Sequence, residues 1–208
     1  MSIYENTLDE YLEAAASKSH TPGGGSVSAV VGANAAAMVS MVANLTLGKK
    51  KYADVQPEVE KILEGATGAI EKLKELTAAD MEAFDRVMDA WRMPSETDEE
   101  KAAKEAALEP AVKNATEVPL RVCRTCLEVL KLAAWLAPIG NKTAISDVGV
   151  GAYVADAALR SAMLSVDINL PSLKDQEFRA AVEAEKQELL KAAEEIKTAC
   201  VADVQKRM

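Results

Sequence analysis

The fold is decided by residues 19–48, SHTPGGGSVSAVVGANAAAMVSMVANLTLG, which contain no Asp, Glu, Lys or Arg. After Gly25 this stretch predicts a helix without a charged face. Its length could span a bilayer, but its Ala, Ser, Gly and Asn residues insert poorly compared with Leu, Ile or Phe. We therefore expect a helix buried on all sides by protein, with no membrane contact. A stripe of small or polar residues at i, i+4 spacing would let another backbone approach closely, either within the fold or in a dimer interface: Ser28, Gly32, Ala36, Ser40 and Asn44.

The rest of the chain also has the 3.6-residue periodicity of helices, interrupted at isolated Gly and Pro residues. Aromatic residues are only 4% of the chain, which disfavours strands. The predicted fold class is all-α, an elongated multi-helix bundle around the charge-free central helix, with residues 1–208 as a single helical domain. Besides the central helix, we expect helices over 58–91, from Thr97 towards Pro110, 111–136 with a kink or break near Pro119, 142–166 and 174–204.

Composition excludes several classes of function. The 24 Lys and Arg residues against 33 Asp and Glu give a net charge of −9, which argues against binding to duplex nucleic acid. The single histidine, His20, excludes a His-rich zinc site and leaves little room for a Ser-His-Asp arrangement, so we expect no metal. Three cysteines and no signal peptide suit free thiols and a cytoplasmic location.

One carboxylate falls at a position where a hydrophobic residue would pack. Asp80 lies four residues after Leu76 and four before Phe84, so on an unbroken helix it points in the same direction as the apolar residues. Burial raises the pKa of a carboxyl group, which suits it to general acid or base catalysis near neutral pH. The alternative is a structural role, as a salt bridge or as a hydrogen-bond partner of a neighbouring helix end.

Three polar segments could bind a ligand, and each also has a structural explanation. Residues Gly23, Gly24, Gly25 and Ser26 could present free backbone N–H groups to a ligand at a helix N-terminus, or could form a flexible connection. Lys49, Lys50 and Lys51 could receive an anionic tail, or could complement the end of the preceding helix.

The third segment surrounds another predicted helix start. Asn141, Ser146 and Asp147 bring an amide, a hydroxyl and a carboxylate close together in the sequence. Such a group can bind a polar heterocycle. It can equally cap the helix, since Asn is a favoured N-cap residue.

Six short motifs, taken together and in order, resemble those of a known family. They are 22-PGGGSV-27, 41-MVANLTLGKKKY-52, 80-DMEAF-84, 117-EVPL-120, Gly140-Asn141 with Ser146-Asp147, and Asn169-Leu170. Across nearly the whole chain the series is similar to the cyclodeaminase/cyclohydrolase family. This family comprises the C-terminal domain of formiminotransferase-cyclodeaminase and stand-alone bacterial methenyltetrahydrofolate cyclohydrolases.

The resemblance implies an all-α homodimer that acts on a one-carbon derivative of tetrahydrofolate, without a metal or a tightly bound cofactor. It implies that Asp80 is the general acid/base. The expected reactions are hydrolysis of 5,10-methenyltetrahydrofolate to 10-formyltetrahydrofolate, or deamination of 5-formiminotetrahydrofolate to 5,10-methenyltetrahydrofolate and ammonia. The alternative is a non-catalytic folate-binding or helical interaction protein.

On this basis we expect three groups of residues to bind the folate. The loop from Gly23 to Ser26, together with Asn141, Ser146 and Asp147, would hold the pterin and the reacting carbon. Residues Lys49 to Lys51 would contact the glutamate tail, which can be polyglutamylated.

Overall fold

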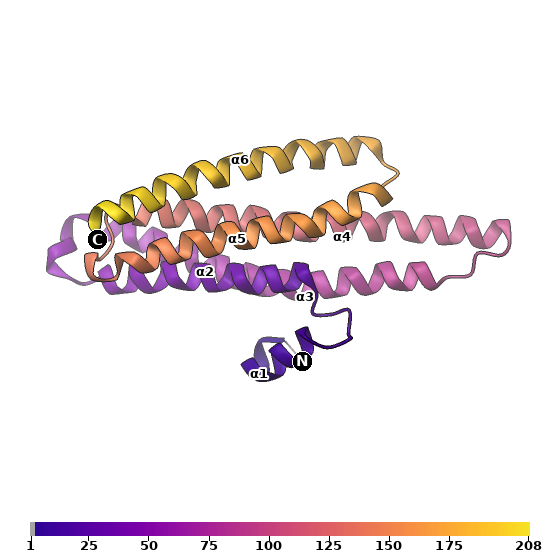
Figure 1. The fold of residues 1–208 in the computed structure, drawn as a ribbon, viewed down its shortest axis with the longest axis horizontal. Helices are drawn as coiled ribbons and strands as arrows, with labels where there is room; N and C mark the ends of the chain where they lie inside the picture. The colour runs from indigo at the N-terminus through magenta and orange to yellow at the C-terminus, as the bar shows by residue number, and fades with distance from the viewer. Residues whose placement is uncertain (1–2) are drawn as a thin grey trace.

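A computed structural model describes residues 3–208, and within that range it contains helices and no strand. The prediction of an all-α elongated bundle is confirmed. Five long helices run along one axis, and the hairpin of α3 and α4 extends beyond the others at one end (Figure 1). The α-helices are α1 (Leu8–Ala15), α2 (Gly24–Thr46), α3 (Gln56–Arg92), α4 (Asp98–Leu136), α5 (Ile145–Asn169) and α6 (Gln176–Arg207). Short 3₁₀ turns are η1 (Ile3–Glu5), η2 (Lys50–Val55), η3 (Lys142–Ala144) and η4 (Leu170–Ser172).

The charge-free helix α2 lies at the centre of the bundle, where it packs mainly against α3 and α5 and also contacts α4. Its small residues allow this close packing. A Cβ atom on Gly151 of α5 would lie 3.2 Å from the carbonyl oxygen of Ala35, so the two helices approach nearly to backbone contact. One stripe of α2, including Met41 and Leu45, remains exposed. Burial on all sides therefore does not hold for the single chain.

Helix α2 is the one helix in residues 3–208 that is long and apolar enough to cross a membrane. Length and composition are weak grounds for a membrane span, because the core helix of a globular bundle has the same properties. In α2, 61% of the apolar stretch is buried inside the bundle. Packing against α3 and α5 therefore accounts for its composition.

Helix α4 differs from the sequence prediction, because it continues through both Pro110 and Pro119. Its start is as predicted, since Thr97 and Glu100 form a capping box. A proline inside a helix leaves the carbonyl four residues earlier without its N–H partner. For Pro119 that carbonyl belongs to Ala115, which instead accepts a hydrogen bond from the side chain of Asn169 at 2.9 Å. This replacement helps the helix to pass Pro119 without breaking.

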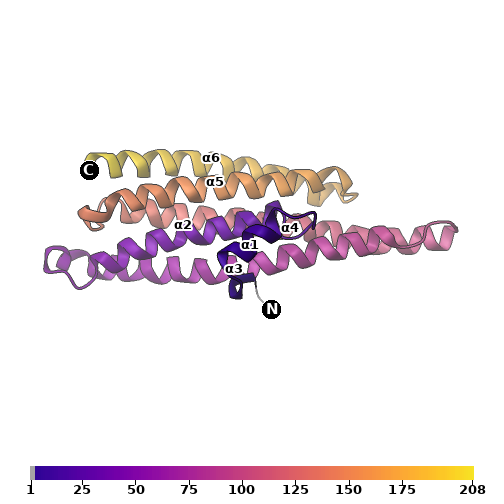
Figure 2. The same cartoon turned by 60° about the horizontal axis from the view of Figure 1, so that its bottom comes forward.

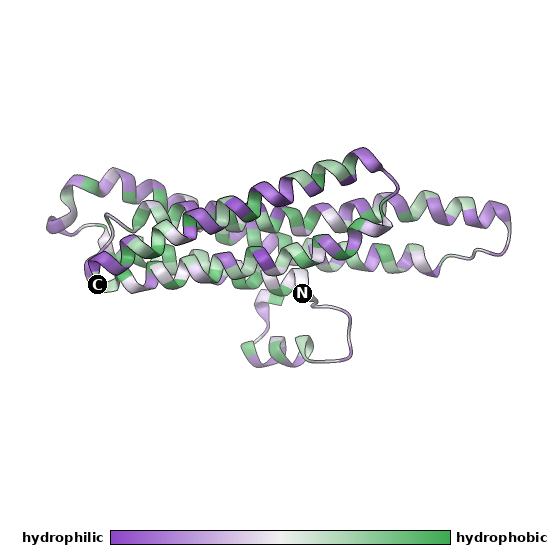
Figure 3. Cartoon of the chain, turned by 45° about the horizontal axis from the view of Figure 1, so that its top comes forward, coloured by the Kyte–Doolittle hydropathy of each residue, from purple (hydrophilic) through white to green (hydrophobic). Residues whose placement is uncertain are grey.

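The C-terminal helix α6 covers α4 and α5 from outside. Polar and apolar residues alternate along it in Figure 3, as expected for an amphipathic outer helix. Arg124 of α4 binds Glu185 of α6 through both its Nε and its Nη2 atoms. This charged pair joins the outer helix to the core.

Two of the three cysteines lie one turn apart on α4, and all three are buried with free thiols. Burial raises the pKa of Cys123 to about 12, and the pKa of Cys126 is raised for the same reason. A protonated, buried thiol is a poor nucleophile. The cysteines are therefore part of the core, in agreement with the expected free thiols.

The short helix α1 was not predicted from the sequence, although Thr7 and Glu10 form a capping box at its start. It lies below the bundle in Figure 1 and in front of it in Figure 2, and it buries none of its residues. The hydroxyl groups of Tyr4 and Thr77 lie 2.9 Å apart and connect this N-terminal segment to α3. The segment then leads into residues 16–23, which reach the candidate site.

Candidate active site

Asp80 lies on α3 and faces the N-terminus of α2. A Cβ atom placed on Gly25 would lie 2.7 Å from both Cγ and Oδ2 of Asp80 and closer still to Oδ1. Real side chains do not approach this closely, so the carboxyl group occupies the space that any larger residue at position 25 would fill. Glycine at position 25 is therefore a steric requirement for Asp80 to reach the helix end.

The surroundings of Asp80 favour its protonated form. Burial raises the pKa of Asp80 above its ordinary value, while interactions with the backbone N–H and the hydroxyl of Ser26 act in the opposite direction and only partly offset the effect. A carboxyl group with a raised pKa exchanges protons closer to neutral pH than an ordinary aspartate does. Asp80 thus meets a helix end, as one interpretation of the sequence predicted, and its raised pKa is compatible with the other, a role in acid/base catalysis.

Hydrogen bonds within the glycine loop hold the start of α2, which Asp80 faces. Ser26 exchanges hydrogen bonds with the backbone of Gly23, at 3.0 Å for both the N–H and the carbonyl of that residue. Gly23 is the N-cap of α2, and Gly24 and Gly25 form its first turn. The first N–H groups of a helix have no partner inside it, so this end attracts carboxylates and other polar acceptors.

Asp80 and the loop line a cavity of about 320 Å³. Apolar side chains form part of the wall, including Phe84 and Val87 of α3 and Ile168 of α5. The remaining lining residues are His20, Thr21, Gly23, Gly24, Gly25, Ala115, Ser165 and Asn169. A largely apolar cavity of this size with a few polar groups is typical of a small-molecule site.

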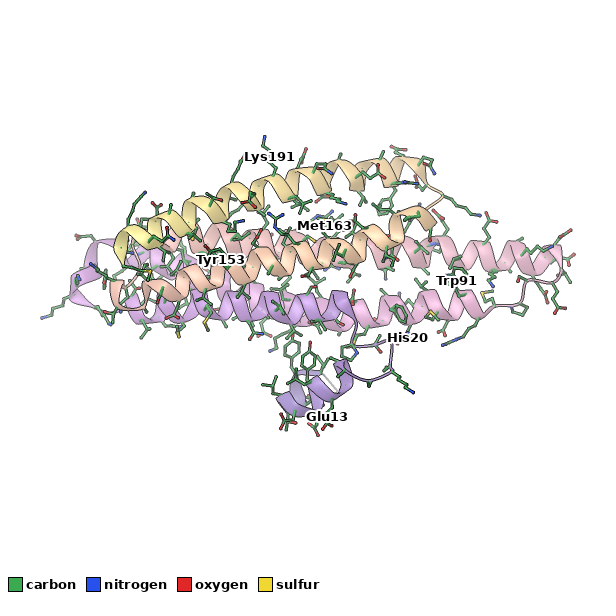
Figure 4. The ribbon with its side chains drawn as sticks, viewed as in Figure 1. Glu13, His20, Trp91, Tyr153, Met163 and Lys191 are labelled. Carbon is green, nitrogen blue, oxygen red and sulfur yellow. The ribbon has the colours of Figure 1, made fainter. Side chains whose placement is uncertain are left out.

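Several lining residues had no predicted role in the site, among them His20 and Asn169. In the sequence, the single histidine was used only as evidence against a His-rich zinc site and a Ser-His-Asp arrangement. In the structure, the ring centroids of His20 and Phe84 lie 5.7 Å apart, and His20 lies beside the start of α2 (Figure 4). Asn169 was part of a motif without an assigned function. Asn169 reaches the cavity only because the end of α5 packs beside the start of α2, and no local pattern in the sequence predicts this packing.

The other predicted binding residues lie at the opposite end of α2, roughly 30 Å from Gly25 along the helix. Asn141 is buried there and binds the end of α2: its backbone N–H donates to Thr46 Oγ1 and its Nδ2 to the carbonyl of Leu45, both at 2.8 Å. Its Oδ1 accepts from the backbone N–H of Thr143. The capping interpretation of Asn141 is therefore the one that the single chain supports.

Lys49, Lys50 and Lys51 follow α2 at this same end and are exposed to solvent. Ser146 is exposed, and Asp147 is half-buried in the first turn of α5. The expectation that Asn141, Ser146 and Asp147 hold one pterin together with the glycine loop does not hold within a single chain. The structure brings Asp80 together with Gly23 to Ser26 and keeps both apart from the lysines.

A second, apolar groove of about 420 Å³ lies between α2 and α5. It shares Gly24, Ser165 and Ile168 with the Asp80 cavity, so the two spaces are adjacent. Large apolar side chains of α5 are exposed near it, with Leu164 at 69% and Ile168 at 77%. Within residues 3–208, no group of three or more His, Cys, Asp or Glu side chains is placed to hold a metal ion.

Comparison with known proteins identifies the family. The family model for formiminotransferase-cyclodeaminase matches residues 7–188. A methenyltetrahydrofolate cyclohydrolase from Methylorubrum extorquens is 48% identical over 172 residues, which are 83% of each chain. The formimidoyltransferase-cyclodeaminase of Sus scrofa is 31% identical over 92% of this chain, which corresponds to 36% of that protein.

A solved structure is similar over nearly the whole chain. The crystal structure of formiminotetrahydrofolate cyclodeaminase from Thermotoga maritima superposes with a TM-score of 0.84 at 36% identity. The superposition covers 99% of this chain and 96% of that one. Sequence and fold agree, and the chain belongs to the formiminotransferase-cyclodeaminase family.

Proposed function

We propose that this protein hydrolyses 5,10-methenyltetrahydrofolate to 10-formyltetrahydrofolate, with Asp80 as the proton-transfer group. The observation that carries this proposal is the raised pKa of Asp80 inside a cavity formed by the start of α2. The 48% identity to a methenyltetrahydrofolate cyclohydrolase favours this reaction over others of the family.

The reaction needs one group that can both accept and donate a proton. Water adds to the methenyl carbon that bridges N5 and N10, and a base must remove a proton from that water. The tetrahedral carbon then releases N5, which needs a proton as its bond to carbon breaks. Asp80 accepts one proton from the attacking water and returns it to N5 as the bond between carbon and N5 breaks. The remaining hydroxyl proton leaves to solvent as the formyl C=O forms, so hydrolysis of the cationic methenyl group releases one proton. This proton transfer contributes about 100- to 10,000-fold in rate.

Cyclodeamination is the second candidate, because the Thermotoga maritima protein is a formiminotetrahydrofolate cyclodeaminase with the same fold. In that reaction N10 attacks the formimino carbon on N5, and ammonia leaves. The leaving nitrogen takes up a proton, which a protonated Asp80 supplies. The two reactions share a tetrahedral carbon at the same position, so one site serves both.

We also propose that the working form is a homodimer joined through α2 and α5. A stripe of α2 whose residues are exposed or half-buried contains no charge and has the 4-3-4-3 spacing that lets two helices pack side by side: Val27, Val31, Asn34, Met38, Met41 and Leu45. Exposed apolar residues of α5, such as Leu164 and Ile168, extend this surface. An uncharged apolar surface of this extent fits a second copy of the same surface.

The dimer also explains why the predicted binding residues lie so far apart. A two-fold axis across the middle of α2 places the start of this helix beside the end of the same helix in the second copy. Lys49, Lys50 and Lys51 of the second copy then lie near the mouth of the Asp80 cavity. In this arrangement they meet the anionic glutamate tail, including a polyglutamylated one, while the pterin occupies the cavity.

The remaining parts of the proposal concern the setting of the reaction. The free, buried cysteines suit a reducing cytoplasm. The acid/base role of Asp80 requires neither a metal nor a tightly bound cofactor, and the substrate is the folate itself. We propose no nucleic acid or membrane as a partner.

The test follows the absorbance of the methenyl bridge and the release of ammonia together. Loss of the methenyl band without ammonia establishes the hydrolase, and growth of the band from formimino-folate with ammonia establishes the deaminase. A protein that binds tetrahydrofolate but changes neither signal is a non-catalytic folate binder, and the proposal is then wrong.

A further inference from the structure

Asn169, the last residue of α5, has a side chain whose amide orientation is fixed. Its Nδ2 donates one hydrogen bond to the carbonyl of Ala115 on α4 and a second to the carbonyl of Ser165, both at 2.9 Å. Two carbonyl oxygens can accept only from the NH₂ group, so the amide cannot flip without losing both bonds. Its Oδ1 is therefore the amide atom that these two bonds leave free to accept.

The first of these bonds depends on Pro119. In a regular helix the carbonyl of Ala115 would accept from the N–H of residue 119, and proline has no N–H. The free carbonyl is thus a consequence of the sequence of α4, and Asn169 supplies its missing partner. The two residues belong to separate motifs, 117-EVPL-120 and Asn169-Leu170, which this hydrogen bond connects.

The side-chain carbonyl of Asn169, unlike its NH₂ group, has no hydrogen-bond partner in the described part of the chain. Its Oδ1 accepts no hydrogen bond there, and the residue lines the cavity that also contains Asp80. Asn169 therefore offers this cavity an acceptor, with both of its donors already used. A fixed acceptor selects a ligand that presents an N–H group.

We infer that Asn169 is a positioning and specificity residue, whose Oδ1 accepts a hydrogen bond from an N–H group of the reduced pterin ring. This inference rests on the proposed function, in which the pterin occupies the cavity, and the reduced pterin carries several N–H donors, among them N3, N8 and the 2-amino group. The bond orients the ring so that the carbon between N5 and N10 faces Asp80. Pro119 acts through Asn169 by fixing the direction of the amide.

The test separates this role from the structural bond to Ala115. Asn169→Leu alone removes the acceptor and also leaves the carbonyl of Ala115 unpaired, which could unfold the helix end. In the Pro119→Ala background, the backbone N–H of residue 119 pairs with that carbonyl instead. The informative comparison is therefore Pro119→Ala/Asn169→Leu against both the wild type and Pro119→Ala, in the full-length protein, because Pro119→Ala keeps the bond from Asn169 to Ser165 but no longer needs the one to Ala115.

The probes are the binding of monoglutamyl tetrahydrofolate, which has no bridging carbon, and the kinetics of methenyltetrahydrofolate hydrolysis. In the double variant we expect the Kd of tetrahydrofolate and the KM to rise about tenfold, with kcat changing much less, because a binding contact is lost. Asn114→Leu, the same substitution at an exposed position of α4 outside the cavity, should leave both constants unchanged.

Two outcomes would overturn the inference. Unchanged Kd and KM in the double variant would mean that Oδ1 does not contact the pterin. A fall in kcat at unchanged KM would mean that Asn169 acts in the chemical step rather than in binding. The proposed function is judged separately by turnover in the wild-type protein, so the two failures are distinguishable.

Discussion

The carboxyl group of Asp80 occupies the space that a side chain on Gly25 would need. A Cβ at position 25 would lie 2.7 Å from the Cγ atom of Asp80, so the glycine of α2 and the aspartate of α3 fit only as a pair. This relationship fixes the distance between the proton-transfer group and the helix end. The following predictions test its consequences.

Gly25→Ala should displace Asp80 from the start of α2 and lower kcat/KM by about 100-fold, because an error of about 1 Å in placing a catalytic group has that effect. Gly68→Ala is the matched control, since a Cβ at position 68 of α3 meets nothing within 4 Å. It should retain full activity. Equal activity of the two variants would show that the placement of Asp80 does not matter for turnover.

Ser26→Ala should move the pH dependence of hydrolysis. Interactions with Ser26 lower the pKa of Asp80, against the larger raising effect of burial. Ser26→Ala removes the hydroxyl interaction and keeps the one with the backbone N–H, so the pKa rises further and less Asp80 is ionised to accept a proton from water at a given pH. The acid limb of kcat/KM should therefore shift to higher pH. Ser28→Ala removes a hydroxyl that bonds Gly24 instead, and the limb should stay in place.

The ionised form of Asp80 should lower the free energy of unfolding at neutral pH. Because burial raises its pKa, the folded state binds more protons than the unfolded state between the ordinary and the raised pKa, and stability falls as pH rises through this window. Asp80→Asn should raise Tm at pH 7, by ~2–4 °C for each kcal/mol gained. The difference should vanish at about pH 3, where aspartate is protonated in both states.

The control for this stability effect is Asp85→Asn. Asp85 lies on the same helix and is exposed, so its replacement should leave Tm at pH 7 nearly unchanged. A lower Tm for Asp80→Asn than for Asp85→Asn at pH 7 would mean that the ionised Asp80 stabilises the fold, contrary to this account.

The sequence predicts most of the fold because its helical signals are local. The absence of charge in 19–48 marks the central helix, and Thr97 with Glu100 marks the start of α4. The predicted break near Pro119 was wrong because the interaction that keeps the helix continuous is not local. The carbonyl of Ala115, which proline leaves without a partner, accepts a hydrogen bond from Asn169, 54 residues away in the sequence. Helix α1 has a capping box like that of α4, and this signal could have revealed it.

The candidate site was predictable only in part, for the same reason. Periodicity identifies Asp80 because an aspartate among apolar residues is anomalous within its own helix. Periodicity does not show which end of α2 the side chain of Asp80 contacts. Asn141 resembles a ligand-binding residue in the sequence, whereas in the structure its side chain and backbone bind the end of α2. The positions of Asp80 and Asn141 both depend on contacts between segments that are distant in the sequence.

A mixing experiment tests whether the lysines act across the dimer. One chain carries Asp80→Asn, and the other carries Lys49, Lys50 and Lys51 all replaced by Gln. Each variant alone lacks an essential group at both sites. If the site is shared, a mixed dimer has one site with neither substitution, and activity should return to about half of the wild-type value per mixed dimer. The readout is hydrolysis of polyglutamylated methenyl-folate after unfolding and joint refolding.

Two results would contradict this arrangement. No recovery of activity in mixed dimers would mean that the lysines of one chain do not complete the Asp80 site of the other. Full activity of the lysine variant on its own, with both monoglutamyl and polyglutamyl substrates, would remove the lysines from folate binding altogether.

The central claim is that Asp80 transfers the proton in a folate site, and Asp80→Asn tests it most directly when binding and turnover are measured on the same sample. The account predicts that the variant folds and binds tetrahydrofolate with an affinity close to that of the wild type. It also predicts that hydrolysis of 5,10-methenyltetrahydrofolate falls by at least about 100-fold. An Asp80→Asn protein that keeps most of its turnover would contradict the claim.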